Sequence, residues 1–359
     1  MFVITFCRAA SMRSFDPGFL RNTQITHGLL RTLTAIAERK GRIQLFRDHA
    51  PQVLETLRHA AVIESTESSN RIEGITAAPE RLRALVAEST APRDRPEQEI
   101  AGYRDVLATI HANHPYISRT PNVVLQLHRD LYHFTTLPGG RWKSVDNSIT
   151  EVQPDGTRIV RFEPVPAYQT AGAMRDLHQR FEEEWERGEV EPLILIAAYV
   201  LDFLCIHPFL DGNGRMARLL TLLLLYHAGH DVGRYVSLER LVEQTKESYH
   251  EALRASSRGW HEGTHTLRPW LEYLLGVVVF GAYSEIDARV GAVTSGRGAK
   301  RELVRDAVQR LPTTFRYVDV ERACPGVSRP TINRALRELR EEGIIRCTRP
   351  GRDATWEKS

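Results

Sequence analysis

The sequence predicts a mainly α-helical protein with a β-hairpin near its middle and a separate basic unit at its C-terminal end. Apolar residues recur at helical spacing over most of residues 20–283. One strong hairpin signal interrupts them, with Pro-Asp-Gly at 154–156 between the β-branched segments 149–152 and 158–162. The last sixty residues hold the excess of positive charge.

The composition limits the classes of protein that the chain can form. Its 359 residues are enough for two or three domains, and 42% hydrophobic and 26% charged residues are ordinary for a soluble globular protein. The four cysteines form no CxxC pair, which argues against a disulfide framework or a zinc ribbon and favours a reducing cytoplasm. The apolar stretch 2–7 is too short for a signal peptide, and no apolar run is long enough to span a membrane.

Four helical segments are expected before the hairpin. The first covers 26–42, with a stop at Lys40-Gly41, and the second covers 50–74. Further helices are expected at 79–112 and 123–134.

Helical patterns resume after the hairpin, from about 168 to 283. A Gly-, Ser- and Ala-rich stretch then indicates a linker. The predicted organisation is an N-terminal helical region at 15–112, a core at 113–289, a linker at 290–299 and a C-terminal unit at 300–359.

Residues 207–218, HPFLDGNGRMAR, are the most informative segment. The apolar run before them, 193–206, is fourteen residues long, which favours a buried helix over a strand. Asp211 is expected to N-cap the next helix, with Gly212-Asn213-Gly214 forming the turn. Free N–H groups at a helix N-terminus bind anions, and phosphate suits such a site.

The charged residues of this segment point to polyphosphate chemistry. Arg215 and Arg218 lie three residues apart, so both are expected to project from one side of the first turns and to hold phosphates. Asp211 is placed to hold a Mg²⁺ ion that bridges two phosphates, and His207 has a pKa suited to accepting a proton. Taken singly, each residue also has a structural explanation; their combination indicates a site.

The segment resembles the Fic family signature HPFx(D/E)GNGRxxR at every specified position, and the resemblance extends over about 20–283. It implies a helical core with a hairpin flap and transfer of AMP from ATP, with Mg²⁺, to a hydroxyl group of a protein. The roles that it implies are a general base at His207, a Mg²⁺ ligand at Asp211, phosphate binding by Gly212, Asn213, Gly214, Arg215 and Arg218, and an adenine contact at Tyr249.

A second match lies upstream. Ser69 to Gly74 fit the pattern (S/T)xxxE(G/N) of the family's inhibitory helix. The resemblance implies that Glu73 pairs with Arg218 and removes the anchor for the γ-phosphate. The structural alternative is that Glu73 merely ends a helix before Gly74.

The hairpin itself suggests how a target is held. Exposed backbone at 145–152 would pair with an extended segment of a target protein, and the alternative is a plain structural hairpin. Lys143 and Asp146-Asn147 depart from the family's more apolar flap tip.

Two other motifs in the sequence lack the context that their chemistry needs. Gly212-x-Gly214-x-x-Ala217, with Asp231 further on, fits a dinucleotide fingerprint, but no strand leads into the first glycine. The HExxH string at 261–265 is expected to form a loop, because Gly263 and Thr264 weaken a helix there, and no third zinc ligand is evident.

The C-terminal segment 297–359 contains fifteen Lys and Arg against nine Asp and Glu. Three helices, at 300–311, at 318–326 and a third that is capped by Ser328 and ends at Gly343, are followed by a hairpin, an order that resembles a winged helix–turn–helix domain. If it binds DNA, the major groove faces Arg329, Thr331, Asn333, Arg334 and Arg337, while Arg349 and Arg352 lie near phosphates. Alternatively the unit binds protein, with Arg334 and Arg337 paired to Glu338 and Glu341.

The sequence thus favours a protein adenylyltransferase held back by Glu73. Two alternatives stay open: a DNA-binding regulator whose Fic site senses nucleotide, and an enzyme that removes AMP. The target protein (the chain itself included), the modified residue type and homodimer formation are also open.

Overall fold

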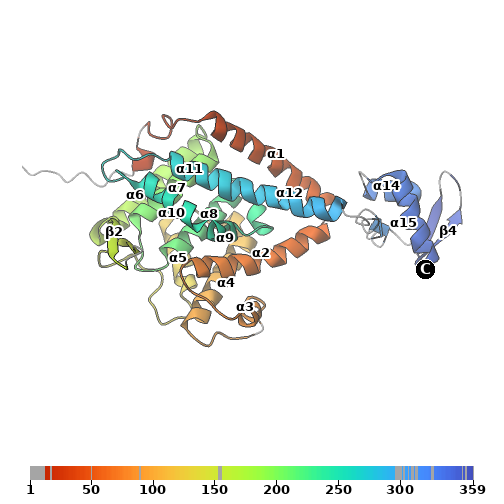
Figure 1. Ribbon diagram of the computed structural model, residues 1–359, viewed down its shortest axis with the longest axis horizontal. Helices are drawn as coiled ribbons and strands as arrows, with labels where there is room; N and C mark the ends of the chain where they lie inside the picture. The colour runs from red at the N-terminus through yellow and green to blue at the C-terminus, as the bar shows by residue number, and fades with distance from the viewer. Residues whose placement is uncertain are drawn as a thin grey trace, which may run out of the picture. The chain divides into compact units, whose positions relative to one another are not determined.

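The computed structural model is mainly helical (Figure 1). It describes the residues 13–16, 18–49, 51–88, 90–152, 156–295, 301, 304–305, 307–308, 311, 314–324, 327–349, 351 and 354–358. The chain divides into two compact units, one formed by 1–37 and 58–282 and the other by 38–57 and 283–359. Among the described helices, none is long and apolar enough to cross a membrane.

The N-terminal region contains a 3₁₀ turn and four α-helices. They are η1 (Arg13–Phe15), α1 (His27–His49), α2 (Pro51–Ile72), α3 (Pro79–Val86) and α4 (Arg95–Asn113). The predicted stop at Lys40-Gly41 is wrong, because α1 continues through Gly41, and one helical glycine costs only about 1 kcal/mol. The expected helix at 79–112 is two helices, since Asp94 caps α4 through the N–H of Glu97.

The hairpin lies between two helices, as predicted. After η2 (His114–Tyr116) and α5 (Pro121–Leu131), strands β1 (Ile149–Val152) and β2 (Arg158–Phe162) pair antiparallel, and α6 (Ala167–Arg187) follows. Gly156 has φ +83°, a conformation that glycine adopts without strain. Residues 153–155 of the predicted turn lie outside the described residues.

Two apolar helices form the centre of the first unit. α7 (Pro192–Ile206) is buried on nearly every side, which confirms the helix predicted from its apolar run. It packs against α6, α10, α11 and the following helix, α8 (Asn213–His227). The loop that joins α7 to α8 is therefore fixed at both ends by the core.

The remaining helices of this region surround that core. They are η3 (Val232–Arg234), α9 (Leu238–Gln244), α10 (Lys246–Ser257), α11 (Arg268–Tyr273), the π-helical turn η4 (Leu274–Val279) and α12 (Phe280–Ser295). The stretch 290–299, interpreted as a linker, begins as helix, because α12 continues to Ser295. Its remaining residues lie outside the described part of the chain.

The C-terminal region has a small core of its own. β3 (Thr314–Arg316), α14 (Tyr317–Ala323), α15 (Arg329–Glu341), β4 (Ile345–Arg349) and β5 (Thr355–Lys358) form an antiparallel sheet of order β3-β5-β4 with two helices packed on it. Of the three expected helices, α14 and α15 correspond to the second and third, and the hairpin was expected too. The first expected helix, at 300–311, lies only partly among the described residues. The short strand β3 was not, because three residues carry too little periodicity to identify a strand.

Candidate active site

The loop between α7 and α8 has an unusual backbone. His207 ends α7 with φ +50° and ψ +62°, a left-handed conformation that non-glycine residues seldom adopt. Gly212, with φ +81°, caps α8 in place of Asp211, whose Oδ1 instead accepts the N–H of Gly212 at 2.6 Å. The expectation that Asp211 is the N-cap is therefore wrong by one residue, and its carboxylate lies just ahead of the helix.

Side-chain hydrogen bonds hold this loop closed. Asn213 accepts the N–H of Phe209 at 2.9 Å and donates to the carbonyl of Phe209 at 2.8 Å. His128 stacks on the Phe209 ring at 3.6 Å, accepts the N–H of Gly140 through Nδ1, and so donates through Nε2 to the carbonyl of Asp211. The Asn213 side chain therefore shapes the loop rather than facing the cavity beside it.

A second set of contacts joins the loop to the segment before the hairpin. Lys143 Nζ donates to Ile206 O at 3.1 Å and to Asn147 Oδ1 at 2.8 Å, and the Lys143 N–H donates to Pro208 O. Asn147 Nδ2 donates to Phe209 O at 2.9 Å. Lys143 is buried, and burial lowers its pKa to about 8. These residues, predicted near a flap tip, brace the loop instead.

His207 is arranged as a neutral imidazole. Its Nδ1 lies 3.4 Å from the carbonyl of Leu204, and a carbonyl only accepts, so Nδ1 carries the proton and Nε2 keeps a free lone pair. Burial lowers the pKa of His207 to about 4. The ring is therefore able to accept a proton at neutral pH.

A cavity of about 230 Å³ opens beside His207. Residues from six elements (α2, β1, β2, α7, α8 and α10) and two loops line it, among them Glu73, Arg161, His207, Gly214, Arg218 and Tyr249. Tyr249 is buried, and its ring packs against Trp270 and Tyr273. Burial raises the pKa of the Tyr249 phenol.

Glu73 occupies the end of this cavity at the start of α8. Its Oε1 accepts a hydrogen bond from Arg218 Nη2 at 2.8 Å, which confirms the predicted pair. A Cβ on Gly214 would lie 2.2 Å from the same oxygen, so the carboxylate requires glycine there. Burial raises the pKa of Glu73, but the Arg218 charge outweighs it, and the carboxyl titrates below its ordinary 4.5.

Ser69 completes the contact with Arg218. The guanidinium donates from Nε to Ser69 Oγ and from Nη2 to Ser69 O, both at 2.8 Å. Gly74, with φ +80°, lets the chain turn away directly after Glu73. Glu73 therefore does follow directly on the end of a helix, and it also binds Arg218. Among the described residues of α8, Arg218 is the arginine whose guanidinium lines the cavity.

Arg215 does not join Arg218 in the cavity. Its side chain is 1% exposed, and its Nη1 lies 2.7 Å from Glu99 Oε2 on α4. Its Nη2 donates to the Tyr132 hydroxyl at 2.7 Å. The expectation that both arginines project together is wrong, because the buried Glu99 draws Arg215 toward α4 and α5.

Asp211 is the one acidic residue of the signature, and its carboxylate is 58% exposed. Among the described residues, no group of three His, Cys, Asp or Glu is placed to hold a metal ion. A Mg²⁺ ion that arrives with a nucleotide needs only one or two carboxylates plus phosphate oxygens. The exposed Asp211 beside the start of α8 fits that requirement.

The structure explains why the dinucleotide fingerprint and the HExxH string do not form the sites that their residues suggest. A helix, α7, precedes Gly212 where a dinucleotide fold needs a strand. The HExxH residues lie in turns, with His261 Nε2 bonded to Glu163 O and His265 Nε2 3.0 Å from Ser14 Oγ. The two histidines serve different contacts and share no helical face.

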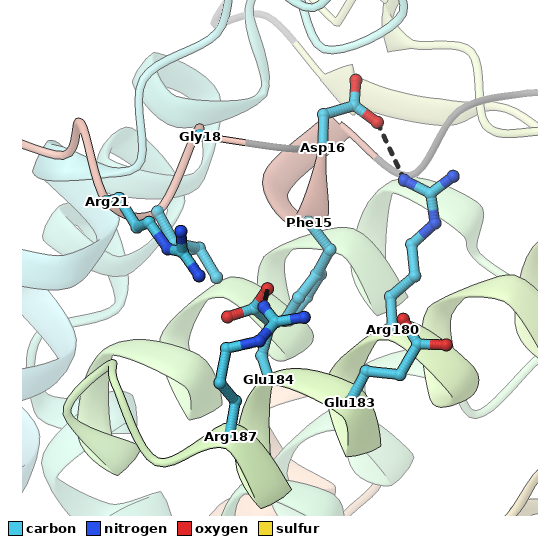
Figure 2. A pocket seen from close by; sticks show the side chains of 9 residues that line it. Phe15, Asp16, Gly18, Arg21, Arg180, Glu183, Glu184 and Arg187 are labelled. Carbon is cyan, nitrogen blue, oxygen red and sulfur yellow. Dashed lines mark hydrogen bonds and ion pairs between the residues drawn. The ribbon is translucent and has the colours of Figure 1, made fainter.

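A second cavity, of about 520 Å³, lies away from the signature, between α6 and the segment after η1 (Figure 2). Its arginines are paired with carboxylates: Arg180 with Asp16 at 3.0 Å, Arg187 with Glu184, and Arg21 with Glu189. Because each positive charge is compensated, the cavity shows no preference for an anion.

The candidate DNA-contacting residues lie on α15 and β4. Arg329 pairs with Glu321 at 2.6 Å, and Thr331 Oγ1 lies 2.9 Å from Ser328 Oγ. The side chains of Asn333, Arg334, Arg337 and Arg349 are exposed, and Arg352 lies outside the described residues. Glu338 pairs with Arg301 rather than with Arg334 or Arg337, so the expected pairing with Glu338 is wrong.

Sequence reasoning missed several residues of the site. Glu99 and Tyr132 hold Arg215, and Lys246 Nζ donates to the carbonyl of Ile72 at the end of α2. None of them stands in a recognisable motif. They meet the site through the packing of α4, α5 and α10, and that packing is a tertiary property.

The geometry agrees with the comparisons with known proteins. Residues 116–225 match the model of the Fic/DOC family, so the chain carries a Fic/DOC domain. The "Protein adenylyltransferase Fic" of Nematostella vectensis is 26% identical over 223 residues, covering 57% of this chain and 44% of that protein. A Fido domain-containing protein of Dictyostelium discoideum is 30% identical over 93 residues, covering 26% of this chain and 61% of the relative.

Solved structures share the fold. A Fic family protein from Desulfovibrio desulfuricans superposes with a TM-score of 0.63 at 22% identity, covering 94% of this chain and 97% of the other. A Fic domain-containing signaling protein from Bacteroides thetaiotaomicron gives 0.57 at 21% identity, with 72% and 98% covered. Fic-1 from C. elegans gives 0.55 at 19% identity, with 75% and 73% covered.

Proposed function

We propose that this protein transfers AMP from MgATP to a hydroxyl group on a protein side chain, and that Glu73 holds the activity low. The observation that supports it most is the cavity in which a neutral His207 and the guanidinium of Arg218 lie beside the start of α8. The chain spans 44% and 61% of the two curated relatives, one of which is named an adenylyltransferase.

The proposed reaction needs one proton acceptor and an anion site. The target hydroxyl oxygen forms a bond to the α-phosphorus of ATP, and its proton passes to His207 Nε2. The bond from the α-phosphorus to its bridging oxygen breaks, and pyrophosphate leaves with that electron pair. Such a transfer depends on alignment and charge compensation more than on covalent chemistry by the protein.

The phosphates have a defined place in this scheme. The free N–H groups at the start of α8, from Asn213 and Gly214 onward, and the Arg218 guanidinium supply positive potential. Asp211 would hold the Mg²⁺, which neutralises phosphate charge when it is bound. Arg215 contributes its charge from behind the helix, through its contact with Glu99. Tyr249 supplies an aromatic surface for the adenine base of ATP.

Glu73 provides the inhibition. Its carboxylate lies against Gly214 and Arg218, where an anionic phosphate oxygen would otherwise bind. Because the pKa of Glu73 is below its ordinary value, this carboxylate is charged at neutral pH and repels a second anion. Nucleotide therefore competes with the protein's own side chain for Arg218.

Intact-protein mass after incubation with MgATP tests the proposal. Wild type, Glu73→Gly and Glu73→Gly/His207→Ala are compared with and without a lysate of candidate targets. An added AMP on the Glu73→Gly protein or on a target, lost in the double variant, is expected, because a general base contributes about 10²–10⁴ in rate.

No adduct on any protein, despite nucleotide binding by the Glu73→Gly variant, would contradict the transferase. Loss of AMP from a modified protein on addition of the wild type would instead support the reverse reaction. Inclusion of CTP, GTP and UTP in parallel determines the nucleotide preference.

A further inference from the structure

An arginine on strand β2 faces the candidate active-site cavity. Arg161 and its neighbour Phe162 both line that cavity. In a regular strand, successive side chains point to opposite faces of the sheet, so two adjacent residues are not expected to face the same cavity. The pairing of the hairpin must therefore depart from the regular pattern at this point.

A β-bulge produces that departure. Ile149 lies opposite Phe162, and the next residue of β1, Thr150, lies opposite Val160. Arg161 is thus an extra residue of β2, without a cross-strand partner. A bulge of this kind bends the strand and changes the direction of a side chain, and such bulges are frequent beside active sites. The bulge accounts for the presence of Arg161 in the cavity wall.

Three lysine and arginine side chains line the cavity, and two of them are engaged by the protein. Arg218 is bound by Glu73, and Lys246 Nζ donates to Ile72 O at 2.9 Å. The Nε of the third, Arg161, is buried and has no hydrogen-bond partner among the described residues. Burial lowers the pKa of the Arg161 guanidinium, which still carries its charge at neutral pH. A buried donor of this kind favours a ligand that brings an acceptor.

The surroundings of Arg161 suit a nucleobase better than a phosphate group. Arg161 interacts electrostatically with Cys205, Tyr249 and His250, so these side chains lie near it. Together with Phe162 they offer a largely aromatic and apolar surface, on which a planar base is able to pack. The phosphates are better accommodated at the start of α8, where free N–H groups supply positive potential.

We propose that Arg161 is a specificity-determining residue, which donates a hydrogen bond to an acceptor atom of the nucleobase and so decides which nucleoside triphosphate the cavity binds. This inference rests on the proposed nucleotide transfer. A guanidinium only donates, so it favours a base edge with a ring nitrogen or a carbonyl oxygen and disfavours one with an amino group. For ATP the acceptor is a ring nitrogen of adenine. A base that leaves the buried donor unpaired binds more weakly.

Calorimetry with the Mg²⁺ complexes of ATP, GTP, CTP, UTP and tripolyphosphate tests the inference. The full-length Glu73→Gly/His207→Ala protein is the reference, because it lacks the competing carboxylate and avoids turnover. In this background, Arg161→Met should weaken binding of the best-bound nucleotide about tenfold or more and bring the four nucleotide affinities closer together. Binding of tripolyphosphate should not change. Arg161→Lys keeps the charge but not the planar fork of donors, so it should lose the preference too.

The matched control is Arg158→Met. Arg158 lies on the same strand, is exposed and does not line the cavity. The control should bind all five probes as the reference does, and a loss of preference in the control would mean that the hairpin, and not Arg161, sets it.

The outcomes separate this inference from the proposed function. It would be overturned by a reference that binds all four nucleotides equally, by an unchanged preference in Arg161→Met and Arg161→Lys, or by an equal loss of affinity for nucleotides and tripolyphosphate. Each of these results leaves the proposed AMP transfer standing. The expected change of preference, together with no AMP transfer by the Glu73→Gly protein, would contradict the transferase alone. No nucleotide binding by the reference would contradict both.

Discussion

Helix α8 carries two arginines three residues apart, and each meets a glutamate from another helix or its end. Arg215 pairs with Glu99, whose side chain is 4% exposed, and both groups are enclosed. Arg218 pairs with Glu73, whose side chain is 36% exposed and faces a cavity. The same chemical pair is thus a fixed part of the interior at one position and a displaceable contact at the other.

The difference follows from what can replace the carboxylate. Arg215 is enclosed by the protein, so the loss of Glu99 leaves a buried charge whose remaining carboxylate neighbour, the exposed Asp211, lies 3.9 Å from Nη2. Arg218 opens on a cavity, so an anion from solvent is able to take the place of Glu73. A contact that a ligand can replace is suited to regulation, and one that it cannot replace is suited to stability.

The largest effect is expected from Glu99→Gln. With the buried Arg215 charge left to the exposed Asp211 at 3.9 Å alone, the free energy of unfolding should fall by about 3 kcal/mol. Urea unfolding followed by circular dichroism measures it. Glu182→Gln, which breaks the half-exposed pair with Arg119, is the control and should cost less than about 1 kcal/mol. Equal losses in the two variants would remove the distinction between the pairs.

Glu73→Gln should act on binding rather than on stability. With the competing charge gone, MgATP should bind about ten- to a hundredfold more tightly, since a hydrogen bond to a charged group contributes about 1.5–3 kcal/mol. Calorimetry in a His207→Ala background avoids turnover. Glu67→Gln, which breaks a pair with Arg71 on the same helix, is the control and should leave the affinity unchanged.

Ser69→Ala tests the same contact by removing a different hydrogen-bond partner of Arg218. It removes the acceptor for Nε but keeps the carbonyl and Glu73, so the restraint weakens by about 1 kcal/mol. The rate of AMP transfer should rise roughly fivefold, less than with Glu73→Gly. A rise equal to that of Glu73→Gly would mean that Ser69, and not the carboxylate, maintains the inhibition.

The smallest effect concerns pH. The pKa of His207 is lowered to about 4, so protonation disables the base only as the pH falls toward that value. The Glu73→Gly variant should keep nearly its full rate at pH 6, whereas a histidine with the ordinary pKa of about 6.5 would lose roughly fourfold there. A pH–rate profile with a midpoint near 6.5 would contradict the buried, neutral His207.

Much of the fold was predictable because its signals are local. The apolar run of α7, the hairpin flanking Gly156 and the helix of Ser328 onward each depend on residue types within a few positions. Two helix ends were predicted wrongly. α1 continues through Gly41, where a stop was expected, and α12 continues to Ser295, inside the expected linker, because the neighbouring helix formers outweighed a glycine signal.

The sequence by itself determined the residues of the signature and their order, and its resemblance to the family pattern predicted the pairing of Glu73 with Arg218 that the structure shows. Only the tertiary structure separated Arg215 from Arg218, placed Lys143 and Asn147 under the His207 loop, and left the arginines of α15 exposed while their neighbours paired. Those outcomes depend on which distant side chain lies within hydrogen-bond reach. The spacing of residues along the chain does not predict the distance between two distant side chains, because the packing of several helices sets that distance.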